Sequence, residues 1–424
     1  MEHINLPHKD KNNWNKICEK YFKKNIKDFS DLNDIFFEGK YPFFNEINKN
    51  YKNEGDEFVK VYKYLKKLIL DLDEKILPYK IKILKAKEND KLELTRRQVA
   101  ILFLLSFFKI MNKDLRFCVY NIISTTKKGT KFEFGRCFLS YLTNIGKWLS
   151  EQNPILEEKI KFIRISKPKE SNDYIENTDF CDIKIYEKGS LFDGDASYCV
   201  DFANRYIGGG VLTGGCVQEE ILFATQPEAI ASLLFMEKMG NNDAIRIDNT
   251  IQYSNYEGYA RSFVFKSNGI ENDTNKIKRT KLIAIDAFPH SQIRDKKIIE
   301  RDIHKAFVGF KLVFYDEKEV KEEKTIATGN WGCGAFGGDY ELKLLQQWIA
   351  ASFAGIKRLD YYTFNNKNVK YIIEMLKEIK NKYKKVKDLY IDISTKTFSE
   401  GKVVKILLDQ STKNNDDDYC CIII

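Results

Sequence analysis

Histidine is scarce in this chain: the 424 residues include four, and two of these, His3 and His8, lie close to the first residue. A histidine-based catalytic triad or a metal site with several histidine ligands is therefore not expected, and acid–base chemistry should fall to carboxylates. The nine cysteines are odd in number and include no Cys-x-x-Cys pair, which argues against a disulfide framework and a cysteine-based zinc site. They favour a reducing compartment, the nucleus or the cytoplasm.

Long apolar runs are also missing. The most apolar run, residues 99–108, is far shorter than the ~20 residues of a membrane span. The N-terminal residues lack the apolar core of a signal peptide. Lys and Arg exceed Asp and Glu by 70 − 61 = 9, an excess too small to identify an anionic partner. With 43% hydrophobic residues, the sequence predicts a soluble globular protein with a large core.

Helical periodicity dominates the first part of the chain. Apolar residues recur at spacings of three and four over residues 57–72, and further helices are predicted at 99–111 and 136–149. The tetrapeptide Thr95-Arg96-Arg97-Gln98 has the form of a capping box ahead of the second of these helices. We therefore predict a mostly helical accessory region over residues 1–155.

Strand-like and helical segments alternate from residue 156 to about 410. Strands are predicted at residues 159–165, 182–186, 197–202, 244–247, 262–265, 281–285, 325–328, 358–363 and 389–393. Helices are predicted at residues 218–224, 227–239, 297–309, 340–353 and 369–384. This alternation indicates an α/β layered sheet with helices on both faces, in which binding sites gather at the carboxyl ends of strands.

One stretch, residues 198–220, combines features of a binding site. A predicted strand runs into three consecutive glycines, Gly208, Gly209 and Gly210, and the helix that follows opens with Gln218-Glu219-Glu220. Glycines allow positive φ and a close approach of backbone to ligand, and carboxylates beside such a loop are candidates for proton transfer. The alternative is a plain turn into a helix whose acidic first turn suits the helix dipole.

The three acids of this stretch differ in their expected positions. Asp201 interrupts an apolar strand, so it is either a buried hydrogen-bond anchor for the glycine loop or a site residue. Glu219 and Glu220 are adjacent and diverge by ~100° on a helix, which predicts distinct roles for the two.

A second glycine-rich segment, residues 328–338, contains Asn330, Trp331 and Phe336 and precedes Asp339, the predicted cap of the next helix. Such a nest of backbone N–H groups at a helix N-terminus is suited to a phosphate or diphosphate. No Gly-Lys-Ser/Thr closes the segment, so it is not a Walker loop. The alternative is a mobile glycine loop without a ligand.

Two aromatic clusters complete the set, at residues 252–259 and 361–364. Their rings can offer a face to a base, although core or surface tyrosines explain most such clusters. Together the segments describe a site with a diphosphate nest, aromatic faces and two or three carboxylates, without metal ligands. The alternative for the whole set is a nucleotide-metabolite binder without catalysis.

These motifs resemble the poly(ADP-ribose) glycohydrolase family of eukaryotic type. The signature is a glycine triplet followed by Gln-Glu-Glu, here VDFANRYIGGGVLTGGCVQEEI, and the resemblance continues in the same order through QYSNYEGYA, KLIAIDAF and ATGNWGCGAFGGD. It spans roughly residues 186–364. It implies a macrodomain fold preceded by a helical accessory region. It also implies an enzyme that hydrolyses the ribose–ribose O-glycosidic bonds of poly(ADP-ribose) without a cofactor or metal.

The resemblance also assigns roles to residues. Asp201, Glu219 and Glu220 match the family's catalytic acids, with Glu220 as the general acid/base and Glu219 fixing the reacting ribose. The matching substrate-binding positions are Asn204, Gly208, Gly209, Gly210, Gln218, Tyr259, Asn330, Trp331, Gly332, Cys333, Gly334, Ala335 and Phe336. Tyr259 matches the tyrosine that packs on the adenosine, and residues 330–336 match the loop around the diphosphate and distal ribose.

One departure concerns the adenine end of the site. The family has an aliphatic residue followed by an acid just before the signature strand. Here Leu191 fits the aliphatic position, Phe192 replaces the acid, and the segment is one residue shorter before Asp201. Asp193 is the nearest acid that can compensate.

The expected activity is release of ADP-ribose from poly(ADP-ribose), and the alternative is a macrodomain that binds the polymer without cutting it. Expected partners are poly(ADP-ribose) and ADP-ribosylated proteins, in the DNA damage response, with no direct nucleic-acid contact required and a monomeric state. Residues 411–424 are a polar, acidic tail ending in the form of a CaaX box, Cys421-Ile422-Ile423-Ile424. Prenylation of Cys421, with Cys420 as a second acylation site, would bring the protein to membranes.

Overall fold

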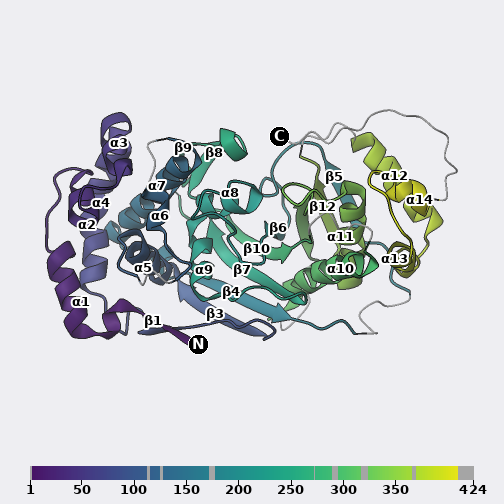
Figure 1. Cartoon of the computed structure of the whole chain (residues 1–424), viewed down its shortest axis with the longest axis horizontal. Helices are drawn as coiled ribbons and strands as arrows, with labels where there is room; N and C mark the ends of the chain where they lie inside the picture. Colours follow the sequence, from purple (N-terminus) through teal and green to yellow (C-terminus); the bar gives the residue numbers. More distant parts are fainter. Residues whose placement is uncertain are drawn as a thin grey trace.

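An eight-stranded mixed sheet runs through the middle of the computed structural model, which describes residues 2–111, 115–124, 128–170, 177–271, 273–288, 295–316, 323–364 and 369–408. The strand order is β3–β4–β7–β10–β6–β11–β12–β5. In that order the strands are Asp90–Thr95, Lys159–Ser166, Asp243–Ile251, Arg279–Asp286, Tyr198–Ala203, Thr325–Gly329, Arg358–Tyr362 and Asp182–Tyr186. Figure 1 shows the twist of this sheet from β3 to β5.

The strands from β10 to β5 are parallel, whereas β7, β4 and β3 pair antiparallel. Asp201 of β6 lies opposite Ala284 of β10, and β11 flanks β6 on its other side. Consequently the carboxyl ends of β10, β6 and β11 meet at one edge of the sheet. Both glycine-rich segments begin at this edge, as expected for a layered α/β sheet.

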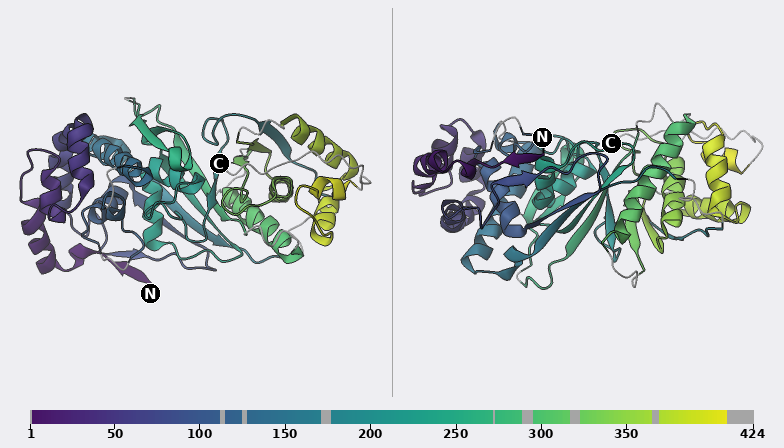
Figure 2. Two further views of the ribbon diagram at one scale, coloured as in Figure 1. Left: turned by 45° about the horizontal axis from the view of Figure 1, so that its top comes forward. Right: turned by 90° about the horizontal axis from the view of Figure 1, so that it is seen from below.

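Helices cover both faces of the sheet (Figures 1 and 2). One face carries α5 (Arg96–Phe107), α6 (Tyr120–Ile123), α7 (Thr130–Ser150), α8 (Gln218–Thr225) and α9 (Ser232–Phe235). The opposite face carries α10 (Lys296–Lys311), α11 (Tyr340–Ala354), α12 (Val369–Lys382), α13 (Val386–Thr395) and α14 (Val403–Leu407). Each face has its own continuous apolar cluster, so the sheet lies between two cores.

The N-terminal helices form an end layer beyond α7 (Figure 2). They are α1 (Lys11–Ile17), α2 (Asp31–Phe37), α3 (Pro42–Asn50) and α4 (Lys52–Leu70), and α4 packs along α7. Two small sheets join β1 (His3–Asn5) with β2 (Lys80–Lys82), and β8 (Ser254–Glu257) with β9 (Val264–Asn268). Short 3-10 turns lie at Pro7–Lys9, Pro154–Glu157, Pro227–Ala231, Ala260–Ser262 and Leu312–Phe314, and a π turn lies at Cys18–Phe22.

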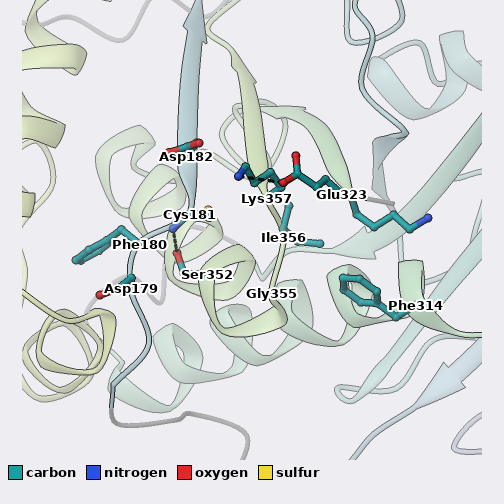
Figure 3. Close-up of a pocket in the computed structure, with 11 residues that line it drawn as sticks. Asp179, Phe180, Cys181, Asp182, Phe314, Glu323, Ser352, Gly355, Ile356 and Lys357 are labelled. Atoms are coloured by element: carbon teal, nitrogen blue, oxygen red, sulfur yellow. Dashed lines mark hydrogen bonds and ion pairs between the residues drawn. The ribbon is translucent and has the colours of Figure 1, made fainter. Parts of the chain in front are cut away.

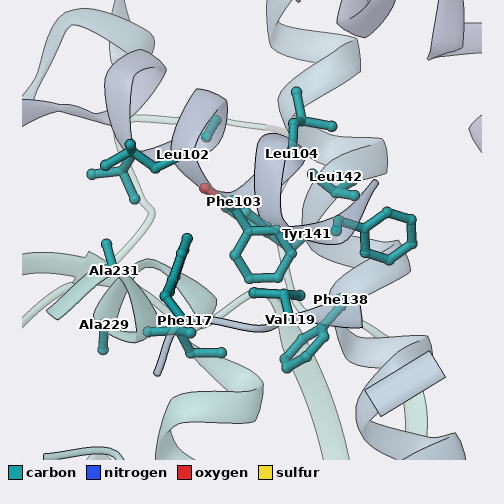
Figure 4. Packing of buried hydrophobic residues seen from close by; sticks show 14 of the residues in the cluster. Leu102, Phe103, Leu104, Phe117, Val119, Phe138, Tyr141, Leu142, Ala229 and Ala231 are labelled. Atoms are coloured by element: carbon teal, nitrogen blue, oxygen red, sulfur yellow. The ribbon is translucent and has the colours of Figure 1, made fainter. Parts of the chain in front are cut away.

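Helix α5 is buried on all sides, as its uninterrupted apolar run predicts. Its side chains from Val99 to Leu105 are at most 1% exposed, and Figure 4 shows Phe103 packed among side chains of α7 and residues near Phe117. The predicted capping box is confirmed: Thr95 accepts from the Gln98 N–H, and Gln98 accepts from the Thr95 N–H. A helix without a polar face is stable only inside a core, and α5 forms the centre of this one.

Two predicted elements are wrong. Residues 389–393, predicted as a strand, belong to helix α13; Leu389 and Ile393 are buried at a spacing of four, whereas Ile391 between them is 47% exposed. The alternation of apolar residues therefore came from a helix with one exposed isoleucine. Residues 227–239, predicted as one helix, form a 3-10 turn and the short α9, after which Met236 becomes extended and pairs with Leu84.

Strand β3 was missed, because residues 1–155 were predicted as mostly helical. It pairs along its full length with β4, so the first part of the chain supplies the edge strand of the central sheet. The alternation Lys91-Leu92-Glu93-Leu94 was the signal for it. The predicted boundary at 155/156 falls between these two paired strands.

None of the described helices has the length and apolarity needed to cross a membrane. The cysteines of the described part, Cys18, Cys118, Cys137, Cys181, Cys199, Cys216 and Cys333, are free thiols. Residues 411–424, with Cys420 and Cys421, lie outside the described residues.

Candidate active site

The glycine loop joins the end of β6 at Ala203 to the start of α8 at Gln218. Gly208 and Gly209 take φ values of +83° and +49°, in the left-handed region that favours glycine. A Cβ on Gly209 would lie 2.6 Å from Glu219 Oε2 and closer still to Glu220 Oε1. The triplet is therefore needed twice, for its backbone conformation and for the space that the two carboxylates occupy.

Glu219 is held by the loop through both carboxylate oxygens. Its Oε1 accepts from the Gly208 N–H at 2.6 Å, and its Oε2 accepts from the Asn204 N–H at 2.8 Å. The side chain is 2% exposed. Burial, followed by the charge of Asp201, raises the pKa of Glu219 well above its usual value, although the two N–H donors oppose this shift.

Glu220 is fixed in the same way but lies nearer the surface. Its Oε1 accepts from the Gly210 N–H and its Oε2 from the Val217 N–H, each at 2.8 Å. Through the second bond, the Glu220 side chain satisfies the N–H of Val217, the residue before α8. Glu220 is 7% exposed, more than Glu219. The two acids thus have different donors and different access to solvent.

Asp201 lies beneath the two glutamates and is not the anchor of the loop. It is 1% exposed, and neither carboxylate oxygen has a hydrogen-bond partner among the described residues. Burial, and then the charge of Glu220, raises the pKa of Asp201 well above its usual value. Of the two interpretations of this residue, the anchoring role falls to Glu219 and Glu220, and Asp201 remains as a candidate site residue.

The raised pKa of Asp201 predicts a stability cost that grows with pH. The Asp201 carboxyl group binds its proton more tightly in the folded state than in the unfolded state. The free energy of unfolding therefore falls as pH rises from about 4, the pKa in the unfolded state, towards the pKa in the folded state. We expect Asp201→Asn to raise the Tm by roughly 2–5 °C at pH 8 and by less at pH 5. Scanning calorimetry of both proteins at the two pH values measures this; an unchanged or lower Tm at pH 8 contradicts it.

Gln218 and the glycine N–H groups are used within the protein. The Gln218 side chain accepts from the Phe202 N–H at 2.9 Å and donates to Val200 O at 3.2 Å. These two bonds to the backbone of β6 fix the start of α8 against this strand. The Gly209 N–H donates to Tyr206 O, and those of Gly208 and Gly210 donate to the glutamates. Contact of the triplet with a substrate would therefore run through its Cα atoms.

Asn204 presents its side chain at the end of β6. The residue is exposed, and its Oδ1 accepts from the Tyr206 N–H at 3.0 Å, which leaves the Nδ2 group without a partner among the described residues. Since the Asn204 N–H binds Glu219, this residue lies beside the catalytic candidates.

The second loop follows β11 and has a rigid base. Trp331 is fully buried, and its Nε1 donates to Ile285 O at 2.9 Å. The Lys343 ammonium lies 4.7 Å from the Trp331 ring centre and pairs with the buried Asp302. Asp339 caps α11 by accepting from the Leu342 N–H, as predicted. The mobile-loop alternative is therefore not favoured.

The outer part of this loop offers unpaired N–H groups. Gly334 and Ala335 are exposed and Phe336 is half-buried, and the backbone N–H groups of all three lack a partner among the described residues. Gly332 has φ +77°, and a Cβ at this position would clash with Ala287. The Cys333 N–H donates to Asn330 O, which turns the chain between these positions. Free N–H groups ahead of α11 are what an anion nest requires.

Asn330 is oriented by strand β12 and the residue that follows it. Its Nδ2 donates to Thr363 O at 3.2 Å, and its Oδ1 accepts from the Tyr361 hydroxyl at 2.9 Å. The cluster at residues 361–364 thus divides into a buried part, which supports Asn330, and the exposed Phe364.

Phe364 and Tyr259 come together although 105 residues separate them in the sequence. Their ring centres are 5.1 Å apart, and Phe364 is 66% exposed with φ +56°. Burial raises the pKa of the half-buried Tyr259 hydroxyl; a backbone hydrogen bond from Gln218 opposes this shift, and the charge of the nearby Glu220 adds to it. Phe364 belongs to the second aromatic cluster predicted from the sequence, but the family resemblance assigned no role to it, and its contact with Tyr259 was not predicted.

The segment at the adenine end is tied to β6. Leu191 O accepts from the Cys199 thiol at 3.1 Å, and the Lys278 ammonium donates to Phe192 O at 2.6 Å and Gly194 O at 2.8 Å. Asp193 accepts from the Ser190 N–H at 2.6 Å, so one of its carboxylate oxygens closes this turn.

The cavity shown in Figure 3 lies away from the residues discussed above. No group of three or more His, Cys, Asp or Glu side chains within the described ranges is placed to hold a metal ion. A cavity of about 500 Å³ opens at the opposite edge of the sheet, at the amino ends of β5, β11 and β12 (Figure 3). It is lined by Asp182, Lys324, Lys357 and their neighbours, none of which was a predicted site residue.

Comparison with known proteins matches both parts of the chain. Residues 171–371 match the macro-domain-fold model of poly(ADP-ribose) glycohydrolases, and residues 50–164 match the helical-domain model of the same family. The chain belongs to the poly(ADP-ribose) glycohydrolase family. The fold is accordingly the macrodomain with a preceding helical domain that the sequence motifs implied.

Individual relatives include a probable poly(ADP-ribose) glycohydrolase 2 of Arabidopsis thaliana, 33% identical over 288 residues, with 57% of this chain and 55% of the relative covered. Poly(ADP-ribose) glycohydrolase 1 of Caenorhabditis elegans is 36% identical over 207 residues, covering 43% of this chain and 26% of the relative. A poly(ADP-ribose) glycohydrolase of Deinococcus radiodurans, solved with ADP-ribose, has a TM-score of 0.34 at 10% identity, covering 47% and 85%. The chain thus spans about half the length of the Arabidopsis relative.

The candidate site residues discussed above, from Leu191 to Phe364, lie within the macro-domain match. The helical-domain match ends at residue 164, beyond the predicted boundary at 155/156, and includes both β3 and most of β4.

Proposed function

We propose that this chain is a glycosidase that hydrolyses the ribose–ribose O-glycosidic bonds of poly(ADP-ribose) and releases ADP-ribose. The observation that carries the proposal is the pair Glu219–Glu220. All four carboxylate oxygens accept backbone N–H groups of one loop, at the carboxyl end of β6 and next to a second loop with free N–H groups. Membership of the glycohydrolase family supports the same activity.

The residues have separate tasks in this proposal. The terminal ADP-ribose places its diphosphate against the N–H groups of residues 334–336 and its adenosine beside Tyr259 and Phe364. Glu219 and Asn204 hold the reacting ribose. Glu220 donates a proton to the leaving ribose oxygen as the glycosidic bond breaks, and then accepts a proton from the water that attacks the anomeric carbon. The substrate's own diphosphate offsets part of the positive charge on the oxocarbenium-like centre.

Asp201 adds a negative charge or a proton beneath this pair, and its lack of a partner fits a residue whose state changes in the reaction. The proposed partners are poly(ADP-ribose) and proteins that carry it, and the proposed setting is the nucleus or cytoplasm, in the DNA damage response. The free thiols of the described part support a reducing compartment. Neither a cofactor nor a second subunit has a role in this chemistry.

Digestion of purified poly(ADP-ribose) tests the proposal. We expect the protein to release monomeric ADP-ribose, identified by chromatography and mass. Because the candidate acids are carboxylates without metal-binding geometry, we expect an excess of EDTA to change the rate by less than about twofold. Binding of ADP-ribose without any product would instead assign the chain to the non-catalytic binding macrodomains.

A further inference from the structure

Three side chains outside the catalytic pair form a cationic cluster at the glycine loop. The Arg116 guanidinium lies 4.6 Å from the centre of the Tyr206 ring, and the Lys238 ammonium lies 5.3 Å from the same centre. All three residues are exposed, Tyr206 to 44%. They come from three separate parts of the chain: the segment before α6, the glycine loop itself, and the extended segment after α9.

Neither cation has an ion-pair partner in the described part of the chain. Among the described residues, no carboxylate lies within ion-pair distance of Arg116 or Lys238, and the hydrogen-bond acceptor of Arg116 is Ile207 O, 3.5 Å from its Nη2. Cations near carboxylates elsewhere in the molecule do pair, as Arg205 does with Asp286. Two unpaired cations held around one aromatic ring form a preorganised site for an anion.

The cationic cluster lies next to the loop that binds Glu219, on the side away from the diphosphate nest. Arg116 contacts Ile207, the residue before Gly208, whose N–H binds Glu219. Partial burial lowers the pKa of Arg116, and the charge of Glu219 opposes this shift. Met239, next to Lys238, donates its N–H to Arg205 O. That segment leads into β7, which lies beyond β10 in the sheet, whereas the diphosphate nest follows β11 on the other side of β6.

We propose that Arg116, Tyr206 and Lys238 form a subsite for the diphosphate of the neighbouring ADP-ribose unit, the one on the leaving side of the bond that is cut. This inference rests on the proposed function. A polymer whose terminal unit extends from the reacting ribose towards the β11 loop must continue from that ribose in the other direction, past Gly208 and Tyr206. The next negative charges along it are a diphosphate, which matches two adjacent cations without carboxylate partners.

The test is the double variant Arg116→Gln/Lys238→Gln, assayed with polymer of about 20 units and with monomeric ADP-ribose. We expect the KM for the polymer to rise about five- to tenfold, whereas the Kd for ADP-ribose changes less than twofold. Loss of two phosphate contacts should also lower the slope of log KM against log salt by about 1.4. Arg116→Lys/Lys238→Arg keeps both charges and should restore most of the polymer affinity.

Two further variants separate this role from general effects. Tyr206→Leu keeps both cations but removes the ring that holds them, and should raise the polymer KM about two- to threefold. Lys377→Gln/Lys384→Gln removes the same charge from exposed positions at the α12 end of the molecule and should leave the KM unchanged.

An unchanged polymer KM in the Arg116/Lys238 double variant would overturn the subsite, as would an equal loss in the distant double variant or an equal loss of monomer binding. Weaker binding of single-stranded RNA of matched charge, with polymer affinity retained, would assign the cations to nucleic acid and also overturn it. If the wild type does not cut the polymer, the proposed function fails. The subsite is then judged by the same comparison of Kd values for the intact polymer.

Discussion

Glu220→Gln should lose turnover of poly(ADP-ribose) by about 10²–10⁴-fold and retain binding of ADP-ribose within about threefold. The amide cannot donate and then accept the proton that glycosidic cleavage requires. It can still accept one of the two N–H groups, from Gly210 or Val217, so the start of α8 and most of the loop should keep their positions. Polymer digestion and calorimetric titration with ADP-ribose measure the two effects.

Two glutamate controls sharpen this experiment. Glu257→Gln makes the same chemical change on an exposed strand, where Lys266 is the ion-pair partner of the side chain among the described residues, and should leave both quantities unchanged. Glu219→Gln should reduce binding as well as turnover, because Glu219 holds both Asn204 and Gly208. A Glu220→Gln protein with full activity would refute the proposed mechanism, and one that no longer binds ADP-ribose would give Glu220 a structural role instead.

The active-site segments were predictable because their constraints are local. Three consecutive glycines are favoured where the backbone turns sharply or where other atoms leave no space for a Cβ. At Gly209 these atoms are the carboxylates of Glu219 and Glu220, ten and eleven residues later. The cap at Asp339 and the capping box at Thr95 are local in the same sense. Strands β4 to β6 and β10 to β12 follow apolar runs bounded by turn residues, which periodicity detects.

The features that were missed depend on contacts between distant segments. Leu389, Ile391 and Ile393 fit a strand by alternation, and only packing against α10 and α11 decides for the helix. Strand β3 shows alternation over residues 91–94, but its pairing with β4 at the edge of the sheet could not be predicted from a neighbourhood of helices. Asp201 could be placed beneath the loop from the strand period, but its lack of partners follows from how the two glutamates occupy the N–H groups.

The cationic cluster is the clearest case of such long-range assembly. Arg116 is 90 residues from Tyr206 in the sequence, and Lys238 is 32 residues further on, so no motif contains them. Their proximity requires α6 and α9 to pack into the same apolar cluster as α8. The helical part of the chain therefore takes part in the proposed site, through Arg116, as well as covering the sheet.

Arg96→Met should lower the free energy of unfolding by about 3–5 kcal/mol, more than any other single substitution in these predictions. Arg96 is fully buried at the start of α5 and pairs with Glu228, which is also fully buried. Its other nitrogens donate to Glu158 Oε2 at 3.2 Å and Asn249 O at 3.0 Å. This one side chain thus joins the helical part to the turn before α9 and to β7, and its loss leaves the carboxylate of Glu228 buried without a counter-charge.

The adjacent Arg97 provides the matched control. Arg97→Met removes a guanidinium that pairs with Glu157 at the surface, and should cost less than about 1 kcal/mol. We expect the Tm to fall by about 5–10 °C for Arg96→Met and by about 1–2 °C for Arg97→Met. Adding Glu228→Gln to Arg96→Met should recover at least half of the loss, because a neutral amide can still accept from Ile251 N–H or the Tyr253 hydroxyl without a buried charge. Equal Tm values for the two single variants, or no recovery in the double variant, would show that the buried ion pair does not hold the two parts together.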